Sequence, residues 1–238
     1  MTVRDRIIAK ARDVVWRYSY WRGPRKMSEL RQRWQVFRNP KATIRFGANV
    51  KAGPGFHVHA PWGGTLIIGD NCEFRRGTRV DLGPHAVVTI GNNVTFTFDV
   101  IISCDTAVTL EDNVILGQDT YIADGNHKYR DLDQPFLDQG YDYRPITIHK
   151  GAVVHSKVTI INDIGERAVI GANAVITKPI PPFTTAAGVP AKVLDYFGPP
   201  GQEPEGWAPR KTADASPNGS SAERSLSDAA VKQPDETT

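Results

Sequence analysis

A single histidine stands in the longest polar interruption of an otherwise regular chain. His127 lies in the segment Ala123-Asp124-Gly125-Asn126-His127, between two stretches in which large apolar residues recur every six positions. An imidazole exchanges a proton near neutral pH more readily than any other side chain, so its type suits general acid–base chemistry. A lone histidine is a weak signal, because most histidines are structural. Its place in the long interruption makes it the leading candidate for a catalytic base.

The regular stretches around His127 repeat with a period of six. A hexapeptide period is typical of a β-helix, in which one short strand and a bend form one side of a triangular coil of about 18 residues. Gly, Asn and Asp follow many of the apolar positions and suit the corners, where the backbone turns left-handed. A sandwich of alternating strands does not explain repeated six-residue steps. The units open at Ile68, Phe74, Val80; Ile90, Phe96, Ile102; Leu110, Leu116, Ile122; Ile148, Val154, Ile160; and Ile164, Ile170, Ile176.

We therefore expect an all-β fold, a parallel β-helix with the shape of a triangular prism, over residues 41–194. The period stops between Ile122 and Ile148, and residues 123–147 are too polar to enter the core. Insertions in solenoids project from one face, which is often the functional one. The sequence predicts that residues 123–147 form a projecting loop that carries His127.

Charge is distributed unevenly along the 238 residues, whose net charge is +3. Residues 1–39 hold eleven basic and three acidic residues, a net charge of +8, whereas residues 201–238 hold four basic and seven acidic ones, a net charge of −3. No apolar run reaches the roughly 18 residues that span a bilayer, and no secretory signal pattern opens the sequence. With only Cys72 and Cys104 present, we expect free thiols and a cytoplasmic protein.

The two ends of the chain differ from the repeats. Residues 1–40 are expected to be a basic helical segment, with apolar residues at helical spacing from Val3 to Tyr18 and a second helix that has Ser28 as N-cap and Leu30, Trp34 and Phe37 on one side. Two roles remain open for it. It can cap the open end of the solenoid, or lie on the anionic inner face of a membrane. No nucleic-acid recognition module accompanies it. Residues 198–238 are expected to be a disordered tail.

Several motifs accompany the repeats and carry a resemblance. With its loop motifs and closing segment, the chain resembles the left-handed β-helix O-acetyltransferases. It is most similar to the galactoside and maltose acetyltransferases and their capsule and exopolysaccharide relatives, over roughly residues 66–194. The left-handed winding is implied by this resemblance. The motifs are Gly125-Asn126-His127, Asp138-Gln139-Gly140, Arg144-Pro145-Ile146-Thr147-Ile148 and Ala187-Gly188-Val189-Pro190-Ala191-Lys192-Val193.

The resemblance implies transfer of an acyl group from acetyl-CoA to a saccharide hydroxyl, in cell-envelope or extracellular glycan synthesis. His127 matches the family's general base, and the family needs no metal and forms homotrimers. Asp99 matches a substrate-contacting position, but it suits a corner turn equally well. Asp124 and Asn126 flank the histidine and are expected to shape the acceptor pocket. Donor binding is implied for Ala172, Thr177, Lys178 and Lys192.

Three departures from the family pattern lie on the donor side. Val153-Val154-His155 stands where Trp-Ile-Gly is common, the step from Ile160 to Ile164 is four residues instead of six, and Pro179 follows Lys178. These changes leave the identity of the acyl group open. They also leave open a second function, a catalytically degenerate trimeric scaffold that binds partners.

A third function, that of a γ-class carbonic anhydrase, needs zinc held by histidines from the same fold. The family spacing places two histidines five positions apart, and none of the six histidines here are so spaced. His57 and His59 share one face of a predicted strand, and we expect them to form a polar outer surface. The sequence predicts no metal site.

Overall fold

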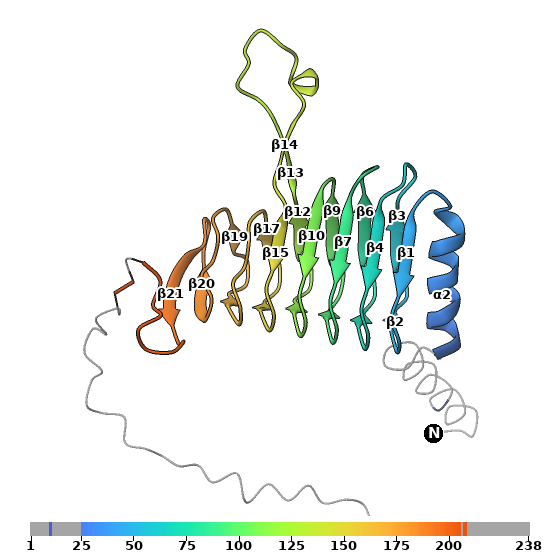
Figure 1. Cartoon of the computed structure of the whole chain (residues 1–238), viewed down its shortest axis with the longest axis horizontal. Coiled ribbons are helices and arrows are strands. Elements are labelled where there is room, and N and C mark those ends of the chain that lie inside the picture. The colour runs from blue at the N-terminus through green and yellow to red at the C-terminus, as the bar shows by residue number, and fades with distance from the viewer. Residues whose placement is uncertain (1–9, 11–24, 206, 209–238) are drawn as a thin grey trace, which may run out of the picture.

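The computed structural model describes residue 10 and residues 25–205 and 207–208. It is a triangular prism of parallel strands with one helix, α2 (Arg25–Arg38), across one end (Figure 1). The first helical stretch expected from Val3 to Tyr18 and most of the expected tail lie outside the described residues. Residues 198–205 contain turns and no helix or strand. No helix in the described part of the chain has the length and apolar character to cross a membrane.

Three sheets form the sides of the prism. Sheet A contains β1 (Thr43–Phe46), β4 (Thr65–Ile68), β7 (Val87–Ile90), β10 (Ala107–Leu110) and β15 (Ile146–Ile148). Sheet B contains β2 (Lys51–Ala52), β5 (Glu73–Phe74), β8 (Thr95–Phe96), β11 (Ile115–Leu116), β16 (Val153–Val154), β18 (Val169–Ile170), β20 (Thr184–Ala187) and β21 (Lys192–Tyr196). Sheet C contains β3 (His57–His59), β6 (Arg79–Leu82), β9 (Ile101–Cys104), β12 (Tyr121–Ala123), β17 (Thr159–Ile160) and β19 (Val175–Ile176).

The predicted β-helix is confirmed, and its core lies along the prism axis. The apolar residues that open the six-residue units point inward and stack on their equivalents one coil away. Phe74 and Phe96 are such equivalents, with ring centroids 4.8 Å apart, and Phe56 at the next corner packs against Phe74 at 5.2 Å. Stacking of this kind buries apolar surface that a single coil cannot bury alone.

The expected coil length of about 18 residues is wrong. Thr43 pairs with Thr65 and Thr65 with Val87, each 22 positions on, whereas Ile148 pairs with Ile164 and Ile164 with Ile180, each 16 positions on. The six-residue step holds around two corners of the triangle. At the third corner, between the end of a sheet C strand and the start of a sheet A strand, the number of residues varies. We call this corner of the prism the third edge; it carries the hairpin of β13 (Gly125–His127) and β14 (Tyr141–Tyr143) (Figure 1).

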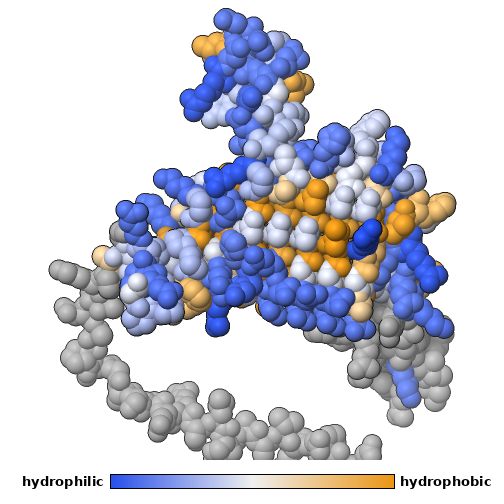
Figure 2. Space-filling model, viewed as in Figure 1, coloured by the Kyte–Doolittle hydropathy of each residue, from blue (hydrophilic) through white to orange (hydrophobic). Residues whose placement is uncertain are grey.

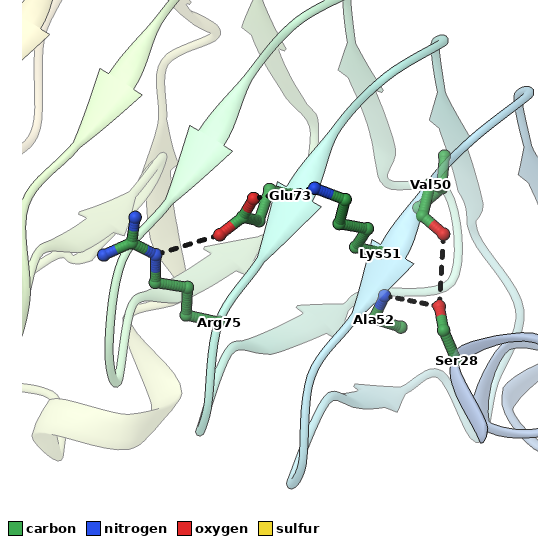
Figure 3. A network of polar contacts seen from close by, with 6 residues as sticks. All are labelled: Ser28, Val50, Lys51, Ala52, Glu73 and Arg75. Atoms are coloured by element: carbon green, nitrogen blue, oxygen red, sulfur yellow. Dashed lines mark hydrogen bonds and ion pairs between the residues drawn. The ribbon is translucent and has the colours of Figure 1, made fainter. Parts of the chain in front are cut away.

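Helix α2 closes the end of the prism with polar side chains. Ser28 accepts a hydrogen bond from Ala52 N (2.8 Å) and donates one to Val50 O (3.1 Å) (Figure 3). Gln35 donates to Phe56 O and accepts from Val58 N, and Asn39 does the same with Val58 O and Ala60 N. A side-chain amide offers one donor group and one acceptor, so it pairs with an open strand as another strand would.

One expectation for the second helix is wrong, that of its N-cap. Ser28 is not its N-cap, because the helix begins three residues earlier and the side chain bonds the first coil instead. The apolar side chains Leu30, Trp34 and Phe37 do not pack on the solenoid; they are exposed. The polar residues are placed at the interface because the end of a β-helix presents unpaired backbone groups that need partners.

Candidate functional site

The hairpin β13–β14 leaves the third edge at Asp124, and this residue fixes its root. The carboxylate of Asp124 is buried and accepts hydrogen bonds from the backbone N–H groups of Asp105, Thr106 and Ala107 at 2.7–2.9 Å. It also accepts one from Thr106 Oγ1, and the backbone of Asp124 accepts one from Arg144 N. A carboxylate with so many partners is a structural clamp. Asp124 was expected to shape the acceptor pocket, and the structure shows that its oxygens join two neighbouring coils at the root of the hairpin.

The far end of the hairpin is also held by hydrogen bonds among its own residues. Gln139 accepts a hydrogen bond from Asp131 N and donates to the carbonyl oxygens of Asp131 and Gln134. Lys128 N donates to Gly140 O. A short 3₁₀ helix, η1 (Phe136–Asp138), lies within this turn. These bonds fix the path of a polar segment that has no apolar core of its own.

His127 lies on one face of the hairpin among aromatic rings. Its ring centroid is 4.2 Å from that of Tyr141 and 5.1 Å from that of Phe136, and Tyr141 stacks on Tyr143 at 5.6 Å. Residues two apart in a strand share a face, so His127 and Gly125 point to the same side as their cross-strand partners Tyr141 and Tyr143. The Nδ1 atom of His127 is buried and has no hydrogen-bond partner among the described residues. This leaves Nε2 as the ring nitrogen available for chemistry.

Gly125 keeps this face open at its root. A Cβ atom at this position would lie 3.0 Å from ring carbons of Tyr143 and 3.3 Å from Asp105 Oδ2. The absence of a side chain therefore lets the ring and the carboxylate approach each other. The pKa of Asp105 is raised because it is partly buried and lies near the Asp124 carboxylate.

Asp105 is a candidate site residue that sequence reasoning missed. It lies one coil before Gly125, since Ser103 pairs with Ala123. The signal that would reveal it is the register between coils. That register cannot be counted in sixes across the third edge, where the number of residues varies from coil to coil.

Two of the predicted acceptor residues do not lie on the face of the hairpin that carries the imidazole of His127. Asn126 pairs with Asp142 on the opposite face of the hairpin. Asp99 lies at the corner between sheets B and C with a left-handed φ of 55°, in the same corner column as Gly77 and Asp119, and forms an ion pair with Arg76 at 3.3 Å. Asp99 thus lies in a turn away from the third edge of the prism.

The predicted donor residues divide into two pairs. Ile176 pairs with Ile160, and Ile122 pairs with Ile160 from the other side. Thr177 and Lys178 therefore hold the positions at the third edge that Ala123 and Asp124 hold two coils earlier. The two pairs of residues are two strand layers apart, roughly 10 Å. Both Thr177 and Lys178 are exposed.

The second donor pair lies at the other end of β19. Ala172 is in the turn that precedes this strand, and Lys192 follows Ala191, whose N–H bonds Val175 O. The width of sheet C therefore separates Ala172 and Lys192 from the third edge. Of the four predicted donor residues, Thr177 and Lys178 are the two that lie at the edge that carries the hairpin.

His57 and His59, which were expected to form a polar outer surface, contact each other and an arginine. His57 and His59 stack with ring centroids 6.3 Å apart, and Arg38 bonds His57 Nδ1 at 2.9 Å. The pKa of His57 is lowered by burial and by the nearby guanidinium groups of Arg38 and Arg79. Within the described residues, no group of three or more His, Cys, Asp or Glu side chains is arranged to hold a metal ion.

Comparison with known proteins connects this fold to a class of enzymes. The chain is 29% identical over 169 residues to a probable acetyltransferase of Mycobacterium tuberculosis, which covers 68% of this chain and 55% of that protein. It is 36% identical over 111 residues to galactoside O-acetyltransferase of Escherichia coli, which covers 45% of this chain and 53% of that protein. The chain thus spans about half the length of these two relatives. No family model matches it.

Solved structures place the fold among the same proteins. A hexapeptide-repeat acetyltransferase of Vibrio cholerae, complexed with acetyl-CoA, matches with a TM-score of 0.50 and 21% identity, over 76% of this chain and 82% of that one. The chain has the fold of the hexapeptide-repeat acetyltransferases. An N-acyltransferase of Bacillus cereus, in complex with dTDP and 3-hydroxybutyryl-CoA, matches this hexapeptide-repeat fold with a TM-score of 0.57 and 13% identity, over 76% of this chain and 90% of that one. The resemblance to left-handed β-helix acetyltransferases is thereby confirmed.

Proposed function

We propose that the protein is an acyl-CoA-dependent O-acyltransferase that acetylates a hydroxyl group of a saccharide. The proposal rests on one observation: the candidate base and two predicted donor residues lie on the same edge of the prism, the third edge. His127 lies on the hairpin that projects from the third edge, and Thr177 and Lys178 lie on the same edge two coils further along the prism. A donor that extends along this edge can carry its thioester toward the imidazole while a lysine remains free to meet a phosphate group.

The proposed reaction is a direct transfer. His127 Nε2 removes the proton of the sugar hydroxyl as the oxygen attacks the thioester carbonyl carbon. The tetrahedral intermediate collapses, the carbon–sulfur bond breaks, and the imidazolium returns its proton to the departing CoA thiolate. Proton transfer of this kind contributes about 10² to 10⁴ in rate, and the oriented binding of both substrates contributes much of the remainder.

The acceptor is proposed to bind on the aromatic face of the hairpin. Tyr141 and Tyr143 present stacked rings beside His127, and the Asp105 carboxylate lies at their root. Apolar ring faces next to a hydrogen-bond acceptor suit a sugar, whose carbon skeleton packs on a ring while its hydroxyl groups donate to a carboxylate. Galactoside O-acetyltransferase, one of the relatives, is named for a saccharide acceptor, which supports the same substrate class.

A homotrimer is proposed to complete the site. Leu132 and Leu137, at the far end of the hairpin, are 95% and 75% exposed in one protomer, and His127 Nδ1 has no partner there among the described residues. The outward residues of β4, β7, β10 and β15 carry no charge, and Figure 2 shows pale and apolar side chains over this face. An uncharged flat face and a projecting apolar tip both suit contact with a second copy.

The test is transfer of radiolabelled acetyl groups from acetyl-CoA to a panel of saccharides and nucleotide sugars, with products identified by mass spectrometry. His127→Ala is expected to lower kcat by about 10² or more and leave acetyl-CoA affinity, measured by calorimetry, nearly unchanged. Asn126→Ala, on the opposite face of the hairpin, is the matched control. Unchanged turnover in His127→Ala removes this residue from the mechanism, and absence of acyl-CoA binding supports the scaffold function instead.

A further inference from the structure

The outer face of α2 has the polarity normally found on the inside of a protein. Met27, Leu30, Trp34 and Phe37 recur at steps of three or four residues, so they share one face of the helix. Leu30, Trp34 and Phe37 are 57%, 55% and 75% exposed, and the rings of Trp34 and Phe37 stack with centroids 5.6 Å apart. The polar face of the helix, in contrast, is the face that contacts the prism.

The capping role of α2 does not explain these apolar side chains. Ser28, Gln35 and Asn39 supply the partners of the first coil, and these three side chains are buried. The apolar face makes no contribution to those hydrogen bonds. A contiguous exposed apolar surface on a soluble protein usually marks a site of interaction.

Positive charge surrounds the apolar face. Residues 25–45 contain seven basic residues and one acidic residue, Glu29, a net charge of +6. The side chains of Lys26, Arg33 and Arg38 on the helix are exposed, as is that of Lys41 in the turn that follows it. Lys41 Nζ lies 5.5 Å from the ring centroid of Trp62, a further tryptophan with 70% exposure.

We propose that the outer face of α2 docks this end of the prism onto an anionic lipid surface. Tryptophan, phenylalanine and leucine side chains enter the boundary between headgroups and acyl chains, while surrounding lysine and arginine side chains meet lipid phosphates. Apolar side chains and basic side chains are both present on α2 and on the turn that follows it. The partner is a membrane surface rich in acidic phospholipid.

The charge around the apolar face favours a lipid surface over two other possible partners, which are residues 1–24 of the chain and a second copy of α2. Residues 1–24 of the chain hold six basic and two acidic residues, a net charge of +4, so packing that segment on α2 would place like charges together. A second copy of α2 would do the same. An anionic surface is the occupant whose charge complements that of the face.

The geometry leaves the proposed transfer site accessible after docking. Helix α2 lies across the end of the prism, so its outer face points away from the coils (Figure 1). The strand order from β3 through β6 and β9 to β12 places the hairpin root three layers further along, roughly 14 Å from β3. The hairpin therefore stands clear of the headgroups. A cyclic trimer with its axis along the prism would present three such faces to one surface and strengthen binding through multivalency.

The experiment is flotation of the full-length protein with vesicles of phosphatidylcholine, with and without phosphatidylglycerol. The wild type is expected to float with the anionic vesicles only, and to be released by high salt. Leu30→Ser with Phe37→Ser is expected to reduce the bound fraction about tenfold, and Arg33→Glu with Lys41→Glu to reduce it as strongly. Val189→Ser with Phe197→Ser removes two exposed apolar side chains from the opposite end of the prism and is expected to bind as the wild type does.

Several results would contradict the lipid proposal, and the experiment distinguishes them. The proposal is overturned if the wild type does not float, if it floats equally with neutral vesicles, or if neither the Leu30→Ser, Phe37→Ser variant nor the Arg33→Glu, Lys41→Glu variant floats less than the wild type. A thermal melt of each variant shows that it is folded. If Leu30→Ser with Phe37→Ser lowers the melting temperature and leaves flotation unchanged, the face covers part of the chain itself and the lipid assignment is wrong. Acetyl transfer to a soluble saccharide is expected to be unchanged in this variant, so docking and catalysis are tested separately.

Discussion

The imidazole of His127 lies against the phenol ring of Tyr141, with ring centroids 4.2 Å apart across the β13–β14 hairpin. This contact holds the histidine ring in one orientation while its buried Nδ1 atom makes no hydrogen bond to any described residue. In most enzymes, an acceptor on the second ring nitrogen orients a catalytic histidine. Here an aromatic neighbour supplies the orientation within one protomer.

Tyr141→Ala is therefore expected to lower kcat by about two- to tenfold, because ring pairs contribute about 0.5–1.5 kcal/mol beyond burial. Tyr141→Phe keeps the ring and is expected to retain nearly full activity. The measurement is the steady-state kinetics of acetyl transfer. If Tyr141→Phe is as impaired as Tyr141→Ala, the hydroxyl group and not the ring is what matters. A positioning role predicts rescue by phenylalanine.

Asp124 is expected to control the stability of the hairpin root. Asp124→Ala leaves the buried N–H groups of Asp105, Thr106 and Ala107 without their carboxylate partner, and we expect a loss of about 3 kcal/mol in the free energy of unfolding. Urea denaturation measures this loss, and hydrogen exchange is expected to show faster exchange in residues 125–143. Asp142→Ala, an exposed carboxylate on the same hairpin, is the control and is expected to change stability by less than about 0.5 kcal/mol. Equal effects in the two variants would contradict the clamp.

The sequence predicted the coils well because stacking leaves a periodic trace. Every inward position of the core must be apolar, so the period of six is visible from Ile68 to Ile176. The coil length was wrong because residues at the third edge project outward and face no packing constraint. Without that length, the register between coils is unknown, and Asp105 could not be placed beside Gly125.

The hydrogen bonds that polar side chains of α2 make to the first coil could not be predicted from the sequence either. Gln35 and Asn39 resemble ordinary surface residues of a helix, and Leu30, Trp34 and Phe37 resemble its buried face. The polar face of α2 is the buried one because the neighbouring surface is an open β edge and not an apolar one. Only the identity of that neighbour determines which face is buried. Likewise, Asp124 and Asn126 are two residues apart on the chain, yet one is a buried clamp and the other is exposed.

Lys178 is expected to contribute to donor binding from the third edge. Lys178→Ala should raise the KM for acetyl-CoA several-fold with little change in kcat, because an exposed lysine interacts with a phosphate by no more than about 1 kcal/mol. Lys157→Ala, at the corner between sheets B and C, is the matched control. Repeating the titration with dephospho-CoA as competitor tells whether the 3′-phosphate is the contact. Identical KM values for both variants would place the donor away from this edge.

Asp105 offers a prediction that separates stability from function. Burial, together with the neighbouring Asp124 carboxylate, raises the pKa of Asp105 in the folded protein. The folded state then binds this proton more tightly than the unfolded chain does, so ionisation of Asp105 destabilises the fold as the pH rises through the raised pKa. Asp105→Asn removes the ionisable group. We expect the variant to melt at a higher temperature than the wild type at pH 7, and the difference to vanish below the ordinary aspartate pKa of about 3.9, where both states of the wild type are protonated.

The same substitution is expected to impair catalysis if the carboxylate receives a sugar hydroxyl. Asp105→Asn should raise the KM for the saccharide acceptor about tenfold, since a hydrogen bond to a charged group contributes about 1.5–3 kcal/mol, part of which the amide oxygen retains. Acetyl-CoA affinity should stay the same. A variant that is more stable at neutral pH and weaker toward the acceptor would show that this carboxylate is kept at the hairpin root for binding, at a cost in stability. A gain in stability with unchanged acceptor kinetics would exclude Asp105 from the acceptor site and leave the aromatic face alone to bind it.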